Sequence, residues 1–117
     1  RKIALELLKL NFQQSRFEAF SKIKEYLSKT SQWDRVFFFL LSFVRDAEVI
    51  HVNRDRVTNK DQMVWVEKIA NLKTEERILY FEDIKKLQEQ FLANQDKTLC
   101  LENFWLNWHQ KHVSLIS

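Results

Sequence analysis

The sequence of 117 residues contains neither glycine nor proline, although average usage would give roughly eight of the first and about six of the second. Hairpin turns usually take Gly or Asn-Gly where φ is positive, and a sheet-rich fold of this length would need several of them. Helices joined by short polar segments need none. The two absences therefore predict an all-α fold, a single compact bundle of five or six helices.

Cysteine is nearly absent as well, because Cys100 is the only one. A single cysteine allows no disulfide within the chain, which favours a reducing compartment and hence the cytoplasm. The chain begins Arg1-Lys2-Ile3 and shows no charged and then apolar leader. We therefore expect residues 1–117 to be one helical domain, excised from the C-terminal part of a larger protein.

Long apolar runs and strong charge of one sign are also missing. Hydrophobic residues make up 45% of the chain and charged residues 30%, and 19 Lys and Arg against 16 Asp and Glu leave a net charge of +3 with the signs interleaved. This balance is typical of a water-soluble globule, neither disordered nor embedded in a membrane. It permits contact with nucleic acid without requiring it.

Apolar residues recur at helical spacing through most of the sequence. The expected helices cover residues 2–12, 16–29, 33–50, about 59–72, Thr74 to just before Asn94, and a last segment through His112. On the second of these, Phe17, Phe20, Ile23 and Leu27 are expected to point inward. Ser15, Ser31 and Thr74 are expected to cap three of these helices, because hydroxyl oxygens can accept hydrogen bonds from the first free backbone N–H groups. The polar stretch from Asn53 to Asp61 is expected to be the main loop.

The helix expected from Trp33 to Ile50 is apolar on two faces. One face is formed by Val36, Phe37 and Leu40, and Phe38, Phe39 and Phe43 cover the other. Such a helix lies centrally in a bundle or packs against another chain. Four Trp and ten Phe are also many for so small a domain, and such a surplus suits a partner interface. The residues expected at that interface are Phe38, Phe39, Phe43, Arg45, Asp46, Phe104, Trp105 and Trp108.

A short basic stretch provides the alternative function, a helical nucleic-acid-binding domain that uses the loop around residues 45–60. The candidate DNA contacts are Arg54, Arg56 and Lys60. Phosphate binding needs basic groups on one surface, but Asp55 and Asp61 lie among them and would cancel much of the field. Any DNA contact is therefore expected to be weak or indirect.

Few residues could support catalysis or metal binding. Cys100 with His109 and His112 is the only candidate cluster, and its spacing matches no common zinc site. A chain without glycine can form no glycine-rich phosphate loop. We therefore expect no catalytic residue, metal, cofactor, small-molecule ligand or enzymatic activity in this domain.

The order of several short motifs resembles the C-terminal collar domain of bacterial DNA polymerase III clamp-loader subunits, with the delta-prime type nearest and gamma/tau next. In that family a helix ending in Arg-Asp leads to an Asn-x-Asp loop, and an Asn precedes a final helix that opens Leu-x-Leu-Glu. The matching residues here are Arg45-Asp46, Asn59 and Asp61, Asn94, and Leu99, Leu101 and Glu102.

The resemblance covers roughly residues 33–110 and implies a role in DNA replication. Family collars are helical bundles that associate side by side and hold the ATPase modules of a pentamer, which opens the sliding clamp and places it on primed DNA. The implied partners are the other clamp-loader subunits, gamma/tau and delta. The collar itself binds no nucleotide in that family. The composition and the resemblance both lead to the expectation of a protein-protein oligomerisation module.

Overall fold

A computed structural model describes the backbone of residues 2–12 and 16–116 and the side chains of these residues as far as Trp108. Within these ranges the chain forms six α-helices and two short 3-10 helices, and no strand. The α-helices are α1 (Lys2–Asn11), α2 (Arg16–Lys29), α3 (Trp33–Val49), α4 (Met63–Ala70), α5 (Thr74–Leu92) and α6 (Lys97–Ile116). The 3-10 helices η1 (Arg54–Arg56) and η2 (Lys60–Gln62) lie between α3 and α4. The predicted all-α bundle is confirmed.

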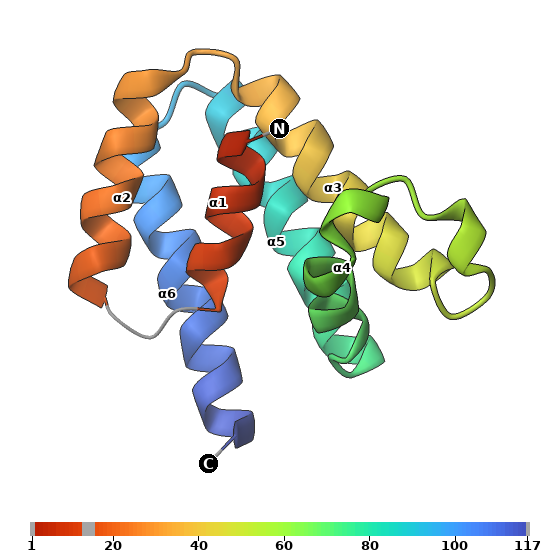
Figure 1. Ribbon diagram of the computed structural model, residues 1–117. Helices are drawn as coiled ribbons and strands as arrows, with labels where there is room; N and C mark the ends of the chain where they lie inside the picture. Colours follow the sequence, from red (N-terminus) through yellow and green to blue (C-terminus); the bar gives the residue numbers. More distant parts are fainter. Residues whose placement is uncertain (1, 13–15, 117) are drawn as a thin grey trace.

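Helix α1 packs against α2, α3 and α6 (Figure 1). On one side α2 lies along α6, and on the other α3 packs against α4 and α5. The last two long helices, α5 and α6, run in opposite directions side by side (Figure 1). The part of the predicted main loop that contains η1 projects beyond the end of α3 (Figure 1). The chain then returns along α3, where Asn59 bonds to Asp46 and Ser42, and η2 leads into α4.

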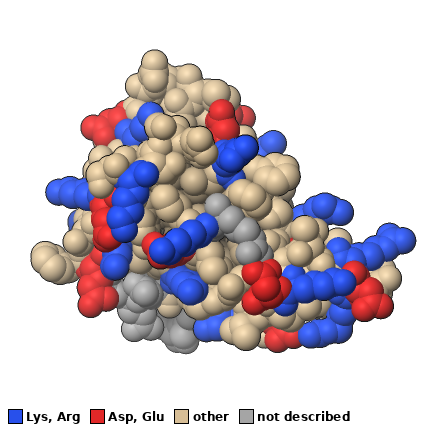
Figure 2. All heavy atoms as spheres, turned by 45° about the horizontal axis from the view of Figure 1, so that its top comes forward, with Lys and Arg blue, Asp and Glu red and all other residues tan. Residues whose placement is uncertain are grey.

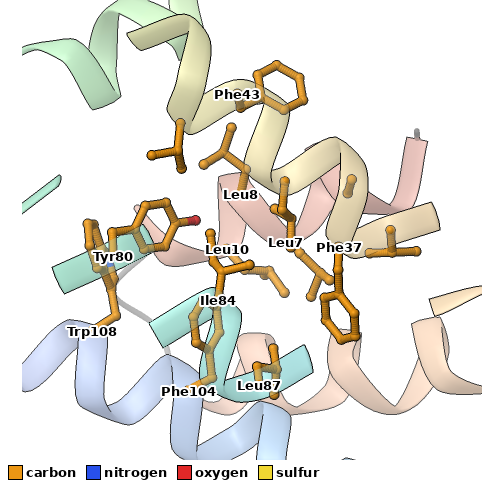
Figure 3. Packing of buried hydrophobic residues seen from close by; sticks show 14 of the residues in the cluster. Leu7, Leu8, Leu10, Phe37, Phe43, Tyr80, Ile84, Leu87, Phe104 and Trp108 are labelled. Atoms are coloured by element: carbon orange, nitrogen blue, oxygen red, sulfur yellow. The ribbon is translucent and has the colours of Figure 1, made fainter. Parts of the chain in front are cut away.

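One apolar core joins all six α-helices. Figure 3 shows its centre, where leucines of α1 meet aromatic and aliphatic side chains of α3, α5 and α6. The labelled residues are Leu7, Leu8, Leu10, Phe37, Phe43, Tyr80, Ile84, Leu87, Phe104 and Trp108. Since each helix presents its apolar stripe to the same centre, burial of these side chains is the main stabilising contribution to the bundle.

The ends of the helices differ in part from the prediction. The residues at the N-caps of α3 and α5 are Gln32 and Lys73, and neither side chain makes a capping hydrogen bond. The predicted caps at Ser31 and Thr74 are therefore wrong, because Ser31 lies one residue before the cap position and Thr74 is already helical. The predicted cap at Ser15 lies outside the described residues.

The connection between α5 and α6 is a compact pair of caps. Asn94 has a positive φ of 60°, and the N–H groups of Asn94 and Gln95 donate to the carbonyls of Phe91 and Gln90. This pattern is the Schellman motif, in which Asn takes the left-handed position usually held by glycine. Asp96 then caps α6, since its Oδ1 accepts from the N–H of Leu99 at 3.1 Å. A turn that often needs glycine is thus made without it.

Candidate partner interface

Four of the aromatic residues predicted at the partner interface belong to the core of the domain itself. Phe43 is fully buried, and the side chains of Phe104, Trp105 and Trp108 are also buried. The prediction that these four contact a partner is wrong, because all four lie in the core of the domain. Phe104 stacks on Tyr80, and Phe20 of α2 meets Trp105 edge to face.

The two tryptophans of α6 also satisfy the end of α1. The indole N–H of Trp105 donates to the carbonyl of Leu10 at 2.9 Å, and that of Trp108 donates to the carbonyl of Asn11. The last carbonyls of a helix have no hydrogen-bond donor within the helix, so the two indole N–H groups take the place that water would otherwise fill. The side chain of Asn11 in turn donates to the hydroxyl of Tyr80 on α5. These contacts fix α1 against α5 and α6.

Asp46, another predicted interface residue, is 1% exposed and stabilises the loop after α3. Its carboxylate accepts from the N–H of Thr58 at 3.0 Å, the N–H of Asn59 at 2.7 Å and the side-chain amide of Asn59 at 2.7 Å. Asn59 is buried too and also donates to the hydroxyl of Ser42. The direct partner role predicted for Asp46 is therefore wrong.

The Asp46–Asn59 contact nonetheless joins two of the motif positions on which the family resemblance rests. They lie thirteen positions apart in the sequence, and the loop between them contains η1. Since a carboxylate with several N–H donors holds a loop firmly, the Arg-Asp and Asn-x-Asp motifs form one structural unit here. Arg45, next to Asp46, stays exposed, and so does Asp61.

The remaining motif positions lie around the start of α6. Asn94 forms the left-handed turn described above, Leu101 is buried in the core and Glu102 is half-buried. Leu99 is 56% exposed. The Leu-x-Leu-Glu motif thus supplies one core leucine and one surface leucine, because residues two apart on a helix point in different directions.

Of the aromatic residues predicted at the interface, Phe38 is exposed and Phe39 is half-buried. Phe38 is 67% exposed, and its ring meets that of Phe39 edge to face, with the centroids 5.6 Å apart. Phe39 also lines a groove between the start of α1 and the start of α3. Half-buried Ile3 and buried Val36 also line the groove.

The rim of the groove between α1 and α3 is mainly basic. Lys2, Lys29 and Arg35 line it, with Glu6 as the acidic side chain among the lining residues. Lys29 is paired with Glu25 on α2, Nζ to Oε1 at 2.7 Å. Apolar surface bordered by basic groups suits a partner that presents apolar side chains flanked by acidic ones. We name Ile3, Arg35, Val36, Phe38 and Phe39 the α3 face.

The basic loop is less positive than its sequence indicates. Arg54 Nη2 lies 2.6 Å from Glu67 Oε1, so the guanidinium is paired with a carboxylate of α4. Arg56 and Lys60 are exposed, with the exposed carboxylates of Asp55 and Asp61 beside them in the sequence. Figure 2 shows basic and acidic side chains interleaved over the face in view. This pattern gives phosphate groups little continuous positive surface.

Cys100 lacks the surroundings of a reactive thiol. It is buried at the start of α6, and burial raises the pKa of its thiol, with Asp96 acting in the same direction. A thiol with a raised pKa is less often the nucleophilic thiolate. The side chains of His109 and His112 lie outside the described residues. Within the described part of the chain, no group of three His, Cys, Asp or Glu side chains could hold a metal ion.

Arg77 is an organising residue that the sequence analysis missed. It is buried, and its guanidinium donates to Glu48 Oε1 at 2.6 Å and to the carbonyls of Ala70 and Leu72 at 3.1 and 2.6 Å. It therefore joins α3, the end of α4 and α5. In the sequence Arg77 follows Glu75 and Glu76 near the start of a helix, and this position does not distinguish it from an ordinary exposed residue.

No family model, curated protein or solved structure matches this chain. Among the helices described, none is both long and apolar enough to cross a membrane.

Proposed function

We propose that this domain is a protein-protein oligomerisation module that holds a clamp-loader subunit in the DNA polymerase III clamp-loader pentamer, in the cytoplasm. The observation that carries the interaction role is exposed Phe38 in contact with half-buried Phe39, which lines the groove between α1 and α3. Exposed aromatic residues next to a pocket are characteristic of residues that dominate binding energy. The assembly itself is inferred from the order of the family motifs.

The way the motif positions are used supports this proposal. Asp46 and Asn59 make one hydrogen-bonded unit, and Asn94 forms the turn that leads into α6. These residues shape the bundle and leave the α3 face available. A scaffold of this kind, with its binding side chains on a rigid helix, is suited to holding neighbours in fixed positions.

The proposal is tested by a pull-down of the purified domain against the gamma/tau and delta subunits of the same organism. Phe38→Asp is the diagnostic variant, because a carboxylate on the α3 face would repel an acidic partner and remove apolar contact. Val64→Asp is the matched control, since Val64 is similarly exposed on α4 at 63%. We expect the unaltered domain and the control to bind and Phe38→Asp to bind at least about tenfold more weakly.

The result is interpretable only if all three proteins have the same helical content by circular dichroism. Absence of binding by the unaltered domain would overturn the clamp-loader assignment. Equal binding by Phe38→Asp would move the interface away from the α3 face. DNA binding that weakens steeply with added salt, in place of partner binding, would favour the alternative function of a nucleic-acid-binding domain.

A further inference from the structure

A second apolar surface lies between α2 and α6, away from the α3 face. It is a groove whose lining includes Phe17, Phe20, Arg16, Lys24 and Glu102. Phe17 is 85% exposed, so the sequence expectation that it points inward is wrong. Arg16 lies over the ring of Phe20, 5.2 Å from the centroid. An aromatic side chain as open to water as Phe17 is costly unless something covers it.

The groove side of α2 has a simple order. Arg16 and Lys24 are exposed cations at its two ends, and the two phenylalanines lie between them. At 1.5 Å per residue the eight residues from Arg16 to Lys24 span about 12 Å. Successive residues of a helix turn by about 100°, which keeps all four side chains on one side of α2.

The first half of α5 carries the opposite pattern on its outer side. Ile78 and Phe81 are 52% and 41% exposed, although they lie on a helix whose Tyr80 and Ile84 are in the core. Glu75 and Glu82 are exposed on the same side, seven residues and about 10 Å apart. Two apolar side chains three residues apart thus lie between two carboxylates, over nearly the same length as on α2.

We propose that the groove between α2 and α6 receives the outer side of α5 from a second copy of this chain. Ile78 and Phe81 would cover Phe17 and Phe20, and the two carboxylates would meet Arg16 and Lys24. The two surfaces match in the sign of these charges, in the spacing of their apolar side chains and in length. This contact uses surfaces other than the α3 face and does not rest on the clamp-loader assignment.

The contact is head to tail, because the groove and the outer side of α5 are different surfaces of one molecule. A dimer joined in this way, and any longer open assembly, leaves one groove free at one end and one α5 surface free at the other. Contacts of this kind generate closed rings when the rotation between copies closes, and open chains when it does not. The surface involved is small and bears charges at its edge, so we expect weak association that falls as salt is raised.

The test is sedimentation velocity of the purified domain from about 10 µM to about 1 mM, a range that detects dissociation constants of weak contacts. We expect concentration-dependent self-association of the unaltered domain. Lys24→Glu in the groove and Glu82→Lys on α5 should each weaken it roughly tenfold, because each places like charges opposite each other. Lys22→Glu is the matched control, as Lys22 is exposed on the other side of α2. It should leave the association unchanged.

A mixture of the two single variants gives the sharpest result. The Lys24→Glu chain keeps an intact α5 surface, and the Glu82→Lys chain keeps an intact groove. In the mixture these two intact surfaces can pair, and the two altered surfaces can also pair through their reversed charges. The mixture should therefore regain the self-association of the unaltered domain, although each variant alone associates roughly tenfold more weakly. A double variant with both changes should regain self-association through the reversed charge pair.

Absence of self-association at about 1 mM, or association that both variants leave unchanged, would overturn this inference. Neither result would affect the pull-down through Phe38. Conversely, self-association that follows these variants, with no binding to clamp-loader subunits, would overturn only the proposed function.

Discussion

At the scale of single residues, buried polar groups determine how this domain holds its irregular segments. Asp46 accepts three N–H groups from Thr58 and Asn59, and Arg77 donates to two carbonyls at and just after the end of α4. A buried polar group without a partner is costly, so each of these contacts favours one loop conformation over others. Asp46 acts in this way on the connection between α3 and α4, and Arg77 on the connection between α4 and α5.

Asp46→Ala is expected to lower the free energy of unfolding by about 2–4 kcal/mol, since the N–H groups of Thr58 and Asn59 would lose a buried acceptor. Urea denaturation followed by circular dichroism measures the change. Asp55→Ala is the matched control, because Asp55 is exposed in the same connection, and a change under about 0.5 kcal/mol is expected there. Equal effects of the two substitutions would contradict the role assigned to Asp46.

At the scale of elements, the helix ends are held by tertiary contacts as much as by local caps. α1 ends on the indole N–H groups of Trp105 and Trp108. α5 ends in the Schellman motif of Asn94. The hydroxyl caps expected from the sequence failed at Ser31 and Thr74, because a cap depends on the backbone angles of one residue. Helix positions could be predicted well from apolar spacing, whereas their ends could not.

Asn94 provides the prediction at this scale. With φ at 60°, Asn94→Ala should lower the free energy of unfolding by about 1 kcal/mol, because a Cβ disfavours the left-handed region. Asn94→Gly should match or exceed the unaltered domain within about 0.5 kcal/mol. Ala93→Gly is the control, since Ala93 has a φ of −80° and gains nothing from glycine. Thermal or urea unfolding of the three variants measures these changes. If Asn94→Gly were no more stable than Asn94→Ala, the result would contradict the role of Asn94 as the left-handed cap.

At the scale of the whole molecule, one core joins every α-helix and includes two tyrosines. Burial raises the pKa of the Tyr80 hydroxyl, partly opposed by the hydrogen bond from Asn11. Burial, followed by the nearby carboxylate of Glu6, raises the pKa of Tyr26. Because the folded state resists ionisation of both groups, their contribution to stability is present at neutral pH and is lost as pH rises above about 10, the ordinary pKa of tyrosine.

We therefore expect the free energy of unfolding to fall between pH 8.5 and pH 11. Urea denaturation at the two values measures the fall. In Tyr26→Phe the fall should be smaller, because one of the two ionisations is gone. Stability that does not decrease over this range, or that decreases equally in both proteins, would contradict the buried, neutral state of these tyrosines.

The α3 face and the groove between α2 and α6 are also properties of the whole molecule. The sequence predicts Phe38 and Phe39 as contacts, but together with Phe43, Phe104, Trp105 and Trp108, which the structure buries. The groove is not predicted, because Phe17 is expected from the sequence to point inward. An apolar residue beside the apolar stripe of a helix gives no sign, in the sequence, of which neighbour covers it.

The sequence by itself determined the fold class and the approximate positions of the helices. Both follow from local features, namely the absence of glycine and proline and the recurrence of apolar residues at helical spacing. Only the tertiary structure decided which aromatic side chains face the core, how Asp46 reaches Asn59 and what Arg77 joins. These depend on how helices distant in sequence pack together, and the periodicity of one helix contains no record of its neighbours.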